Sequence, residues 1–218
     1  MYSAKLGMIF VHIPKTAGQS IEMALLDHLG LPWKARGPLL LRVNHDRRLG
    51  PERLAHLKAL EYVSCGYVPP AQFDAAFKFC FVRNPWDRLF SEYNSRRNLR
   101  RTSFREFVLH GFPKANTFSD AYRHLLPQSD YVFGEDGSNL CDFVGRFETL
   151  NRDFRIVTEK LGLPPIVLRH RNQSVADLKQ QSDGTYLRYQ DFYDPETKAF
   201  VEDFYSRDIA AFGYSFET

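Results

Sequence analysis

The sequence predicts an α/β protein in which a central parallel sheet is covered by helices on both faces, giving three layers. Short apolar runs rich in β-branched and aromatic residues alternate with stretches of helical periodicity, and this alternation is typical of parallel sheets. The chain has 218 residues, of which 44% are hydrophobic and 15% aromatic, enough for one well-buried globular domain. We therefore expect a single domain over residues 1–218.

The first predicted strand covers residues 7–13, where nearly every side chain is apolar, as in a strand buried on both faces of its sheet. Residues 14–18 include a proline and a glycine, so they are predicted as a turn. Residues 19–29 place their leucine and isoleucine side chains on one helical face, and Gly30 is a typical residue at the end of a helix.

The rest of the chain repeats this alternation of strands and helices. Further strands are predicted over residues 61–66, 77–82 and 142–147. Further helices are predicted from Trp86 onward, over residues 148–161 and over residues 195–211. Residues 111–141 have weak periodicity and are predicted as irregular.

Composition excludes several classes of function. A formal net charge of +3 permits an anionic ligand but is too small for a nucleic-acid-binding surface. The three cysteines, Cys65, Cys80 and Cys141, are too scattered for a zinc site or a disulfide framework. No apolar stretch reaches the length of a transmembrane helix, so a cytoplasmic location is expected.

The turn after the first predicted strand has the features of a phosphate-binding loop. A helix start offers unpaired backbone N–H groups and the positive end of the helix dipole. Lysine adds a positive charge, hydroxyls can donate hydrogen bonds, and small residues let an anion approach the backbone. The candidate residues are Pro14, Lys15, Thr16, Ala17, Gly18, Gln19 and Ser20. The order differs from Walker A, and the alternative is an ordinary strand–turn–helix connection with a surface lysine.

A second candidate site follows the predicted strand 77–82. If that strand lies beside strand 7–13, Arg83 emerges at the carboxyl edge of the sheet, where ligands of open α/β folds bind. Ser91 lies about two helical turns further on, so Arg83 and Ser91 could reach one phosphate. The alternative is that Arg83 caps the sheet and Ser91 is a helix surface residue.

Two long motifs resemble those of the carbohydrate-type sulfotransferases, known as sulfotransferase family 2. Residues 12–20, HIPKTAGQS, resemble the 5′-phosphosulfate loop of that family, and residues 79–93, FCFVRNPWDRLFSEY, resemble its 3′-phosphate element. Three later segments are also similar to family segments: residues 128–131, 143–150 and 208–214. The likeness covers nearly the whole chain.

The resemblance implies a P-loop NTPase-like sulfotransferase fold and 3′-phosphoadenosine-5′-phosphosulfate (PAPS) as donor substrate. It implies that a sulfuryl group passes to an acceptor hydroxyl, with a carbohydrate or glycolipid as the expected acceptor. Arg83 and Ser91 would hold the 3′-phosphate. A late loop that covers the nucleotide in relatives adds three donor-site candidates: Arg171, Asn172 and Ser174.

Sulfuryl transfer needs charge stabilisation on the leaving phosphate oxygen and a base for the acceptor hydroxyl. Lys15 is the candidate for the first task, and no metal is expected because no acidic cluster stands out. His45 is the candidate base, since the family has a histidine at a similar place after the first helix. His12 is expected to be a core residue, and Glu22 is a reserve candidate.

Several alternatives remain beside this reading. His28 and His56 fall in helical stretches and are not expected to act in the reaction. Gln19 and Tyr67 depart from the family, in which threonine and histidine are common at these places. Five arginines form either a solvated helix end or a platform for an acidic acceptor: Arg96, Arg97, Arg100, Arg101 and Arg105. An ATP-dependent small-molecule kinase and a non-catalytic adenosine-bisphosphate-binding module are the rival functions.

Overall fold

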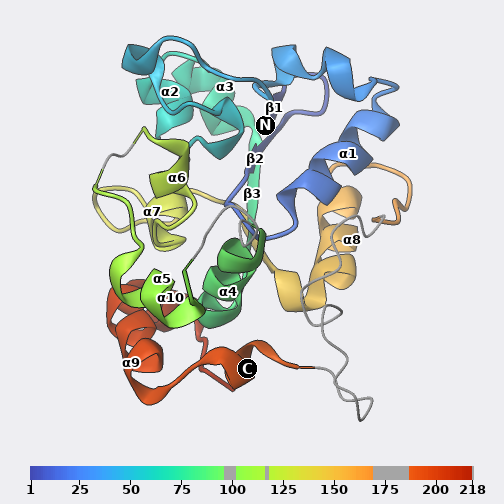
Figure 1. Ribbon diagram of the computed structural model, residues 1–218. Coiled ribbons are helices and arrows are strands. Elements are labelled where there is room, and N and C mark those ends of the chain that lie inside the picture. Colours follow the sequence, from blue (N-terminus) through green and yellow to red (C-terminus); the bar gives the residue numbers. More distant parts are fainter. Residues whose placement is uncertain (96–101, 116–117, 169–186, 218) are drawn as a thin grey trace.

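A four-stranded sheet with the strand order β1-β2-β3-β4 lies at the centre of the chain (Figure 1). The computed structural model describes residues 1–95, 102–115, 118–168 and 187–217. The strands are β1 (Tyr2–Ser3), β2 (Met8–Val11), β3 (Phe77–Val82) and β4 (Phe143–Arg146). The pairs β2–β3 and β3–β4 are parallel, as predicted, whereas the short β1 runs antiparallel to β2.

Both faces of the sheet are buried, and alternate residues of β2 and β3 belong to different cores. Ile9 and Cys80 point into one hydrophobic cluster, whereas Phe10 and Phe79 point into another. All four side chains are fully buried. This explains why the strands read as unbroken apolar runs, since neither face of the sheet is left to water.

Helices supply the opposite walls of these two cores. The helices are α1 (Gly18–His28), α2 (Glu61–Ser64), α3 (Pro70–Ala75), α4 (Pro85–Ser95), α5 (Phe104–His110), α6 (Asp120–Arg123), α7 (Ser129–Val132), α8 (Leu150–Lys160), α9 (Pro195–Phe204) and α10 (Ser206–Phe212). Helices α1 and α8 cover one face, and α2, α3, α7 and α10 contribute to the core on the other (Figure 1). The protein is thus a mixed α/β structure with a mostly parallel sheet flanked by helices.

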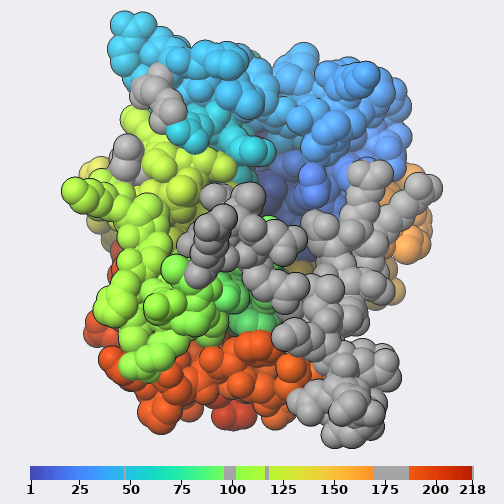
Figure 2. Space-filling model, in the orientation of Figure 1, coloured from blue at the N-terminus to red at the C-terminus, as the bar shows by residue number. Residues whose placement is uncertain are grey.

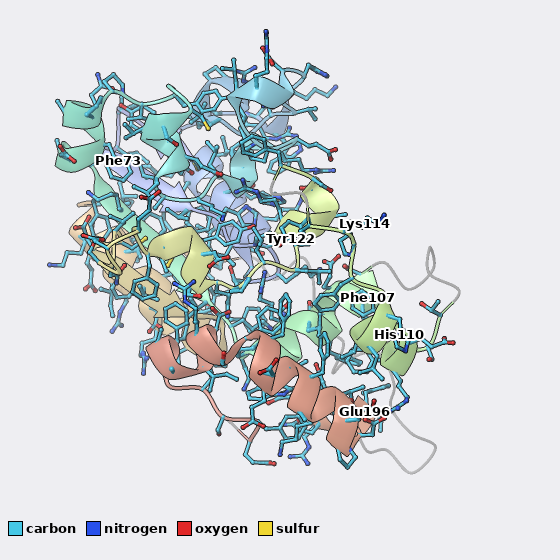
Figure 3. The ribbon with its side chains drawn as sticks, turned by 90° about the vertical axis from the view of Figure 1, so that its left-hand side faces the viewer. Phe73, Phe107, His110, Lys114, Tyr122 and Glu196 are labelled. Atoms are coloured by element: carbon cyan, nitrogen blue, oxygen red, sulfur yellow. The ribbon has the colours of Figure 1, made fainter. Side chains whose placement is uncertain are left out.

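A third hydrophobic cluster lies among α4, α5 and α9, away from the sheet. Its buried residues are largely aromatic and include Phe90 and Phe107. Figure 3 shows α9, which carries Glu196, lying alongside α5, which carries Phe107 and His110. This cluster fixes α4, the helix that follows the second motif.

One predicted strand is wrong. Residues 61–66 form α2 and a following turn instead, with Gly66 in a left-handed conformation at φ +75°. Only Tyr62 of α2 is buried, whereas Glu61 pairs with Arg123 and accepts a hydrogen bond from the backbone of Lys58. A segment as short as residues 61–66 does not show whether it forms a strand or one helical turn, and here the contacts of Glu61 favour the helix.

The parallel pairing brings the two candidate phosphate-binding segments to the same sheet edge. Val11 at the end of β2 is the register partner of Cys80 in β3, so the turn after β2 lies next to Arg83. No helix in the described part of the chain is long and apolar enough to cross a membrane.

Candidate active site

The loop between β2 and α1 is held in an unusual backbone conformation. Lys15 and Ala17 adopt left-handed φ angles of +73° and +67°, a conformation that costs non-glycine residues on the order of 1 kcal/mol or more each and is concentrated at functional sites. Ala17 is also the N-cap of α1. The N–H groups of Gly18 and Gln19 in the first turn therefore have no preceding helical carbonyl, and such groups can donate hydrogen bonds to an anion.

The two hydroxyl groups of the loop have different surroundings. The buried Thr16 hydroxyl donates a hydrogen bond of 2.8 Å to the carbonyl oxygen of Ile13, so its proton stabilises the loop itself. Ser20 lines a separate cavity of about 300 Å³ between α1 and residues 165–167. Among the candidate anion-binding groups of this loop, the backbone N–H groups and Lys15 therefore remain, together with Gln19.

Gly18 is required because the imidazole of His12 lies against its backbone. A Cβ atom at residue 18 would come within 2.0 Å of the His12 ring. The ring is held by Glu22, whose Oε1 lies 2.5 Å from Nδ1 of His12. Burial alone would raise the pKa of Glu22, but the adjacent His12 outweighs it and the pKa lies below its ordinary value. Glu22 is therefore ionised beside His12.

Arg83 lies beside the loop, at the end of β3, and is only 4% exposed. Its Nε donates to Asp87 at 2.7 Å, and its Nη1 donates to the carbonyl oxygen of Lys15 at 3.2 Å. The guanidinium also stacks over Phe147, 3.9 Å from the ring centre. Ser91 lies half-buried on α4, two turns beyond the start of that helix.

A buried amide fixes the backbone of Arg83. The Gln128 side chain accepts a hydrogen bond from the Arg83 N–H and donates one to the Arg83 carbonyl, both at 2.8 Å. The Asp208 carboxylate in turn accepts hydrogen bonds from the backbone N–H groups of Gln128 and Ser129. Two of the later segments named in the sequence therefore act by positioning Arg83.

Arg88 on α4 connects the loop by hydrogen bonds to residues 124–126, on the other side of the pocket. Its buried guanidinium donates to three backbone carbonyls, those of Pro14, Leu126 and His124, over 2.9–3.0 Å. The backbone at Pro14 is therefore fixed from inside the protein before any ligand is bound.

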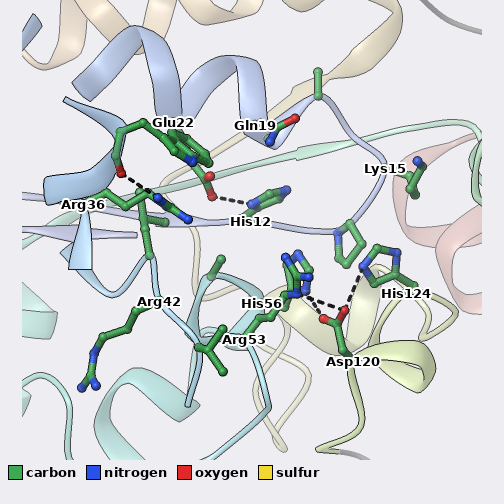
Figure 4. A pocket seen from close by; sticks show the side chains of 17 residues that line it. His12, Lys15, Gln19, Glu22, Arg36, Arg42, Arg53, His56, Asp120 and His124 are labelled. Atoms are coloured by element: carbon green, nitrogen blue, oxygen red, sulfur yellow. Dashed lines mark hydrogen bonds and ion pairs between the residues drawn. The ribbon is translucent and has the colours of Figure 1, made fainter. Parts of the chain in front are cut away.

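A pocket of about 330 Å³ opens beside the loop (Figure 4). Its lining includes Lys15 and Gln19 of the loop region. The other polar or aromatic lining residues are His12, Glu22, Trp33, Arg36, Arg42, Arg53, His56, Asp120 and His124. In the space-filling view, dark blue atoms of the first residues lie recessed between lighter blue and cyan atoms (Figure 2).

His56, Asp120 and His124 lie across the pocket from α1 (Figure 4), and each histidine is paired with a carboxylate. Nδ1 of His56 lies 2.8 Å from Oδ1 of Asp120, and Nδ1 of His124 lies 2.7 Å from Oε2 of Glu92. Burial lowers the pKa of His56 to about 4. Burial would raise the pKa of Asp120, but His56 and the neighbouring cations lower it to about 2. His56 is therefore a neutral imidazole beside an ionised carboxylate at neutral pH.

The predicted base, His45, lies outside the pocket that His56, Asp120 and His124 line. His45 is exposed and lines a neighbouring cavity together with Arg53 and Asp120, which also line the pocket beside the loop. Tyr67, which stands where the family often has histidine, donates a hydrogen bond to the carbonyl oxygen of Leu49. Burial raises the pKa of Tyr67, which makes it a poor base.

Some sequence candidates lie outside the described residues. These are Arg171, Asn172 and Ser174 of the donor site and Arg96, Arg97, Arg100 and Arg101 of the arginine cluster. The fifth arginine, Arg105, is exposed and forms ion pairs with Asp194 and Glu196. Its charge is therefore partly neutralised by α9.

Sequence reasoning missed most of the polar groups on the far wall of the pocket. His12 is buried and His56 lies in a short 3₁₀ helix, as expected, but neither was expected to line the pocket, and both do. Asp120 and His124 were not singled out, although their spacing of four residues is that of neighbours on one helical face. The spacing of Asp120 and His124 was therefore the sequence feature that could have indicated that these two side chains lie close together.

The fold and the site define an α/β protein in which a loop with two left-handed residues at a helix start lies next to a buried arginine. Residues 1–215 match the sulfotransferase family, the one described as family 2, so the chain belongs to this family and is a sulfotransferase. A protein of Archaeoglobus fulgidus, described as an uncharacterized protein, is 35% identical over 98 residues, which are 42% of this chain and 72% of that protein. No solved structure matches the chain significantly.

Proposed function

We propose that this sulfotransferase uses PAPS as donor and transfers its sulfuryl group in line to a hydroxyl of a carbohydrate or glycolipid. The observation that carries the proposal is the contact between Arg83 and the backbone of Lys15. Lys15 of the first motif and Arg83 of the second lie at the same edge of the sheet. A nucleotide with two separate phosphate groups requires a cationic side chain for each of them. The fold that accompanies this function is the three-layer, P-loop NTPase-like one.

In this proposal the 5′-phosphosulfate lies on the loop, over residues 14–20, and contacts Lys15 and the N–H groups of Gly18 and Gln19. The 3′-phosphate lies at Arg83 and Ser91. The Nη2 group of Arg83 has no protein partner among the described residues, so it is available to such a ligand. Arg171, Asn172 and Ser174 are proposed to complete the donor site by resemblance to the family.

Lys15 is proposed to stabilise the negative charge that develops on the leaving phosphate oxygen. For the base we retain His45 and add His56. His56 is favoured because it lines the same pocket as Lys15 and because Asp120 fixes its Nδ1, leaving Nε2 as a proton acceptor. His45 lines the adjacent cavity.

The acceptor is proposed to enter the pocket past Trp33. This side chain is 37% exposed, and the Arg36 guanidinium stacks over its ring at 4.0 Å. Aromatic faces suit sugar rings, and the arginines of the pocket wall, Arg36, Arg42 and Arg53, suit an anionic group on the acceptor.

The first test is a thermal-shift titration with adenosine 3′,5′-bisphosphate on the native chain, on Arg83→Ala and on the exposed control Arg155→Ala. We expect stabilisation of the native chain and of the control, and none of Arg83→Ala. The second test is incubation with labelled PAPS and a panel of glycans, glycolipids and phenols, read by mass spectrometry. Binding of the bisphosphate without transfer to any acceptor would favour the non-catalytic module, and Mg²⁺-dependent ATP turnover would favour the kinase.

A further inference from the structure

Two histidines and a carboxylate converge on the pocket wall, and we call them the His–Asp cluster: His56, Asp120 and His124. Each residue offers one ligand atom, and these atoms lie within 4.8 Å of one another. His56 ends a short 3₁₀ turn (Leu54–His56), Asp120 begins α6, and His124 is the C-cap of that helix. The cluster therefore joins two segments that are far apart in the sequence.

The distances within the cluster fit a tetrahedral metal ion. In a zinc site with bonds of about 2.0–2.1 Å, neighbouring ligand atoms lie roughly 3.3 Å apart. Nδ1 of His56 lies 2.8 Å from Oδ1 of Asp120, and Nε2 of His124 lies 3.8 Å from Oδ2 of Asp120. The two distances end on different oxygens of Asp120, so a rotation of the carboxylate is needed to bring one oxygen close to both nitrogens. The ligand atoms of the three residues already lie within 4.8 Å of one another.

The surroundings of His124 are those of a metal-ligating histidine. Its Nδ1 lies 2.7 Å from the Glu92 carboxylate, which is buried. A carboxylate in this position fixes the ring and leaves Nε2 as the ligand atom. In the cluster, Nε2 of His124 is the atom that faces Asp120.

The cluster is accessible from the pocket. The side chains of His56, Asp120 and His124 are 8%, 16% and 16% exposed, and all three line the pocket beside the loop. Three protein ligands leave the fourth position of a tetrahedral ion open, as in catalytic zinc sites. One charge opposes metal binding, because Nε of Arg53 lies 3.3 Å from Oδ2 of Asp120.

We propose that the His–Asp cluster binds a divalent transition metal ion, with zinc as the ion that its nitrogen and oxygen donors favour. The ligands would be Nδ1 of His56, a carboxylate oxygen of Asp120 and Nε2 of His124. The ion takes the place of the proton between His56 and Asp120, and that ring proton moves to Nε2 of His56. In the metal-loaded protein His56 is a ligand and not a base, a consequence that rests on the proposed function.

The test is a titration of the chelator-treated full chain with Zn²⁺ and with Co²⁺, read by calorimetry and by the visible absorption of tetrahedral cobalt. We expect one ion per chain. His124→Ala and Asp120→Asn should weaken binding by on the order of 100-fold or more, and Glu92→Gln by about 10-fold. Arg53→Gln should tighten binding up to about fivefold, because it removes the competing cation. The control is His110→Ala, an exposed histidine on α5.

Absence of stoichiometric binding by the native chain would overturn the proposal, as would equal binding by His124→Ala and by the control. His124→Gln provides a second variant if His124→Ala does not fold, and circular dichroism identifies the folded variants. The thermal shift with adenosine 3′,5′-bisphosphate is measured on the same samples. A chain that binds the bisphosphate but no metal would contradict this inference alone, whereas a chain that binds metal but no bisphosphate would contradict the proposed function alone.

Discussion

The guanidinium of Arg83 donates a hydrogen bond of 3.2 Å to the carbonyl oxygen of Lys15, across 68 residues of sequence. The loop after β2 and the segment after β3 are thereby joined directly. Because Nε of Arg83 is held by Asp87 at 2.7 Å, the orientation of its guanidinium is fixed before a ligand binds.

The first prediction concerns this arginine. Arg83→Lys keeps the positive charge but loses the planar fork that contacts Asp87 and Lys15 together. Charge-assisted hydrogen bonds contribute about 1.5–3 kcal/mol each, so the affinity for adenosine 3′,5′-bisphosphate should fall by at least about tenfold. Calorimetric titration measures it, with Arg155→Lys as control. Unchanged affinity in Arg83→Lys would show that the contact with Lys15 does not matter for binding.

The second prediction concerns the close approach of Gly18 and His12. In Gly18→Ala the new Cβ would lie 2.0 Å from the imidazole, so either the ring or the loop must move, at a cost of about 1–3 kcal/mol. Both the free energy of unfolding and the bisphosphate affinity should fall, as measured by urea denaturation and thermal shift. Gly37→Ala is the control, since its Cβ would meet only one atom at 3.9 Å. Equal stability of the two variants would contradict this account.

The third prediction concerns Arg88, whose guanidinium donates to three backbone carbonyls, two of them in buried hydrogen bonds. Arg88→Met fills a similar volume but leaves these oxygens without donors, which should cost about 3 kcal/mol. In a chain of this length the melting temperature should fall by roughly 10 °C. Calorimetry measures it against Arg155→Met, whose native side chain is 70% exposed. A fall of the same size in both variants would argue against the role of these hydrogen bonds.

The fourth prediction is a pH dependence of stability in chelator-treated protein. Burial lowers the pKa of His56 to about 4, whereas an imidazole in an unfolded chain titrates near ~6.5. Between these values the unfolded chain binds a proton that the folded chain does not, so the free energy of unfolding falls as pH falls. Above pH ~6.5 the protonation of His56 should leave the free energy of unfolding unchanged. Between pH ~6.5 and pH ~4 it should lower that free energy by on the order of 3 kcal/mol.

Urea denaturation at several pH values measures this slope. His56→Gln should flatten it, whereas His110→Ala should leave it unchanged because that histidine is exposed. An identical slope in His56→Gln would mean that other groups, such as Asp120 with its pKa of about 2, account for acid sensitivity.

The fifth prediction separates the two candidate bases. A positioned general base contributes about 10²–10⁴-fold to a rate, so removing it should lower kcat by at least about 100-fold while binding of the bisphosphate stays intact. In chelator-treated protein, in which His56 holds no metal ion, we expect this loss for His56→Ala and little change for His45→Ala. The opposite pattern would return the role to His45.

The loop and its neighbour could be predicted because local and regular features determine them. A buried strand, a tight turn and a helix are adjacent in sequence at residues 7–29, and parallel strands end at one edge, which places Arg83 beside Lys15. The chemistry of these side chains could therefore be inferred before their contacts were known.

The far wall of the pocket could not be predicted in the same way. His56 ends a 3₁₀ turn of three residues, and Asp120 begins a helix of four residues. Elements this short have no periodicity that indicates which way their side chains point. The wrong strand at residues 61–66 has the same origin, because the pairing of Glu61 with Arg123 is a tertiary contact that local pattern does not contain.

The hydrogen bonds from Asp208 through Gln128 to Arg83 connect the final helix, α10, to the arginine beside the loop. A molecule that loosened the docking of α10 would displace Arg83, and would thereby weaken the proposed nucleotide binding without occupying the nucleotide's place. Selection for donor affinity would accordingly act on residues that never touch the donor. An inhibitor could also act on the surface of α10, outside the substrate sites of this enzyme.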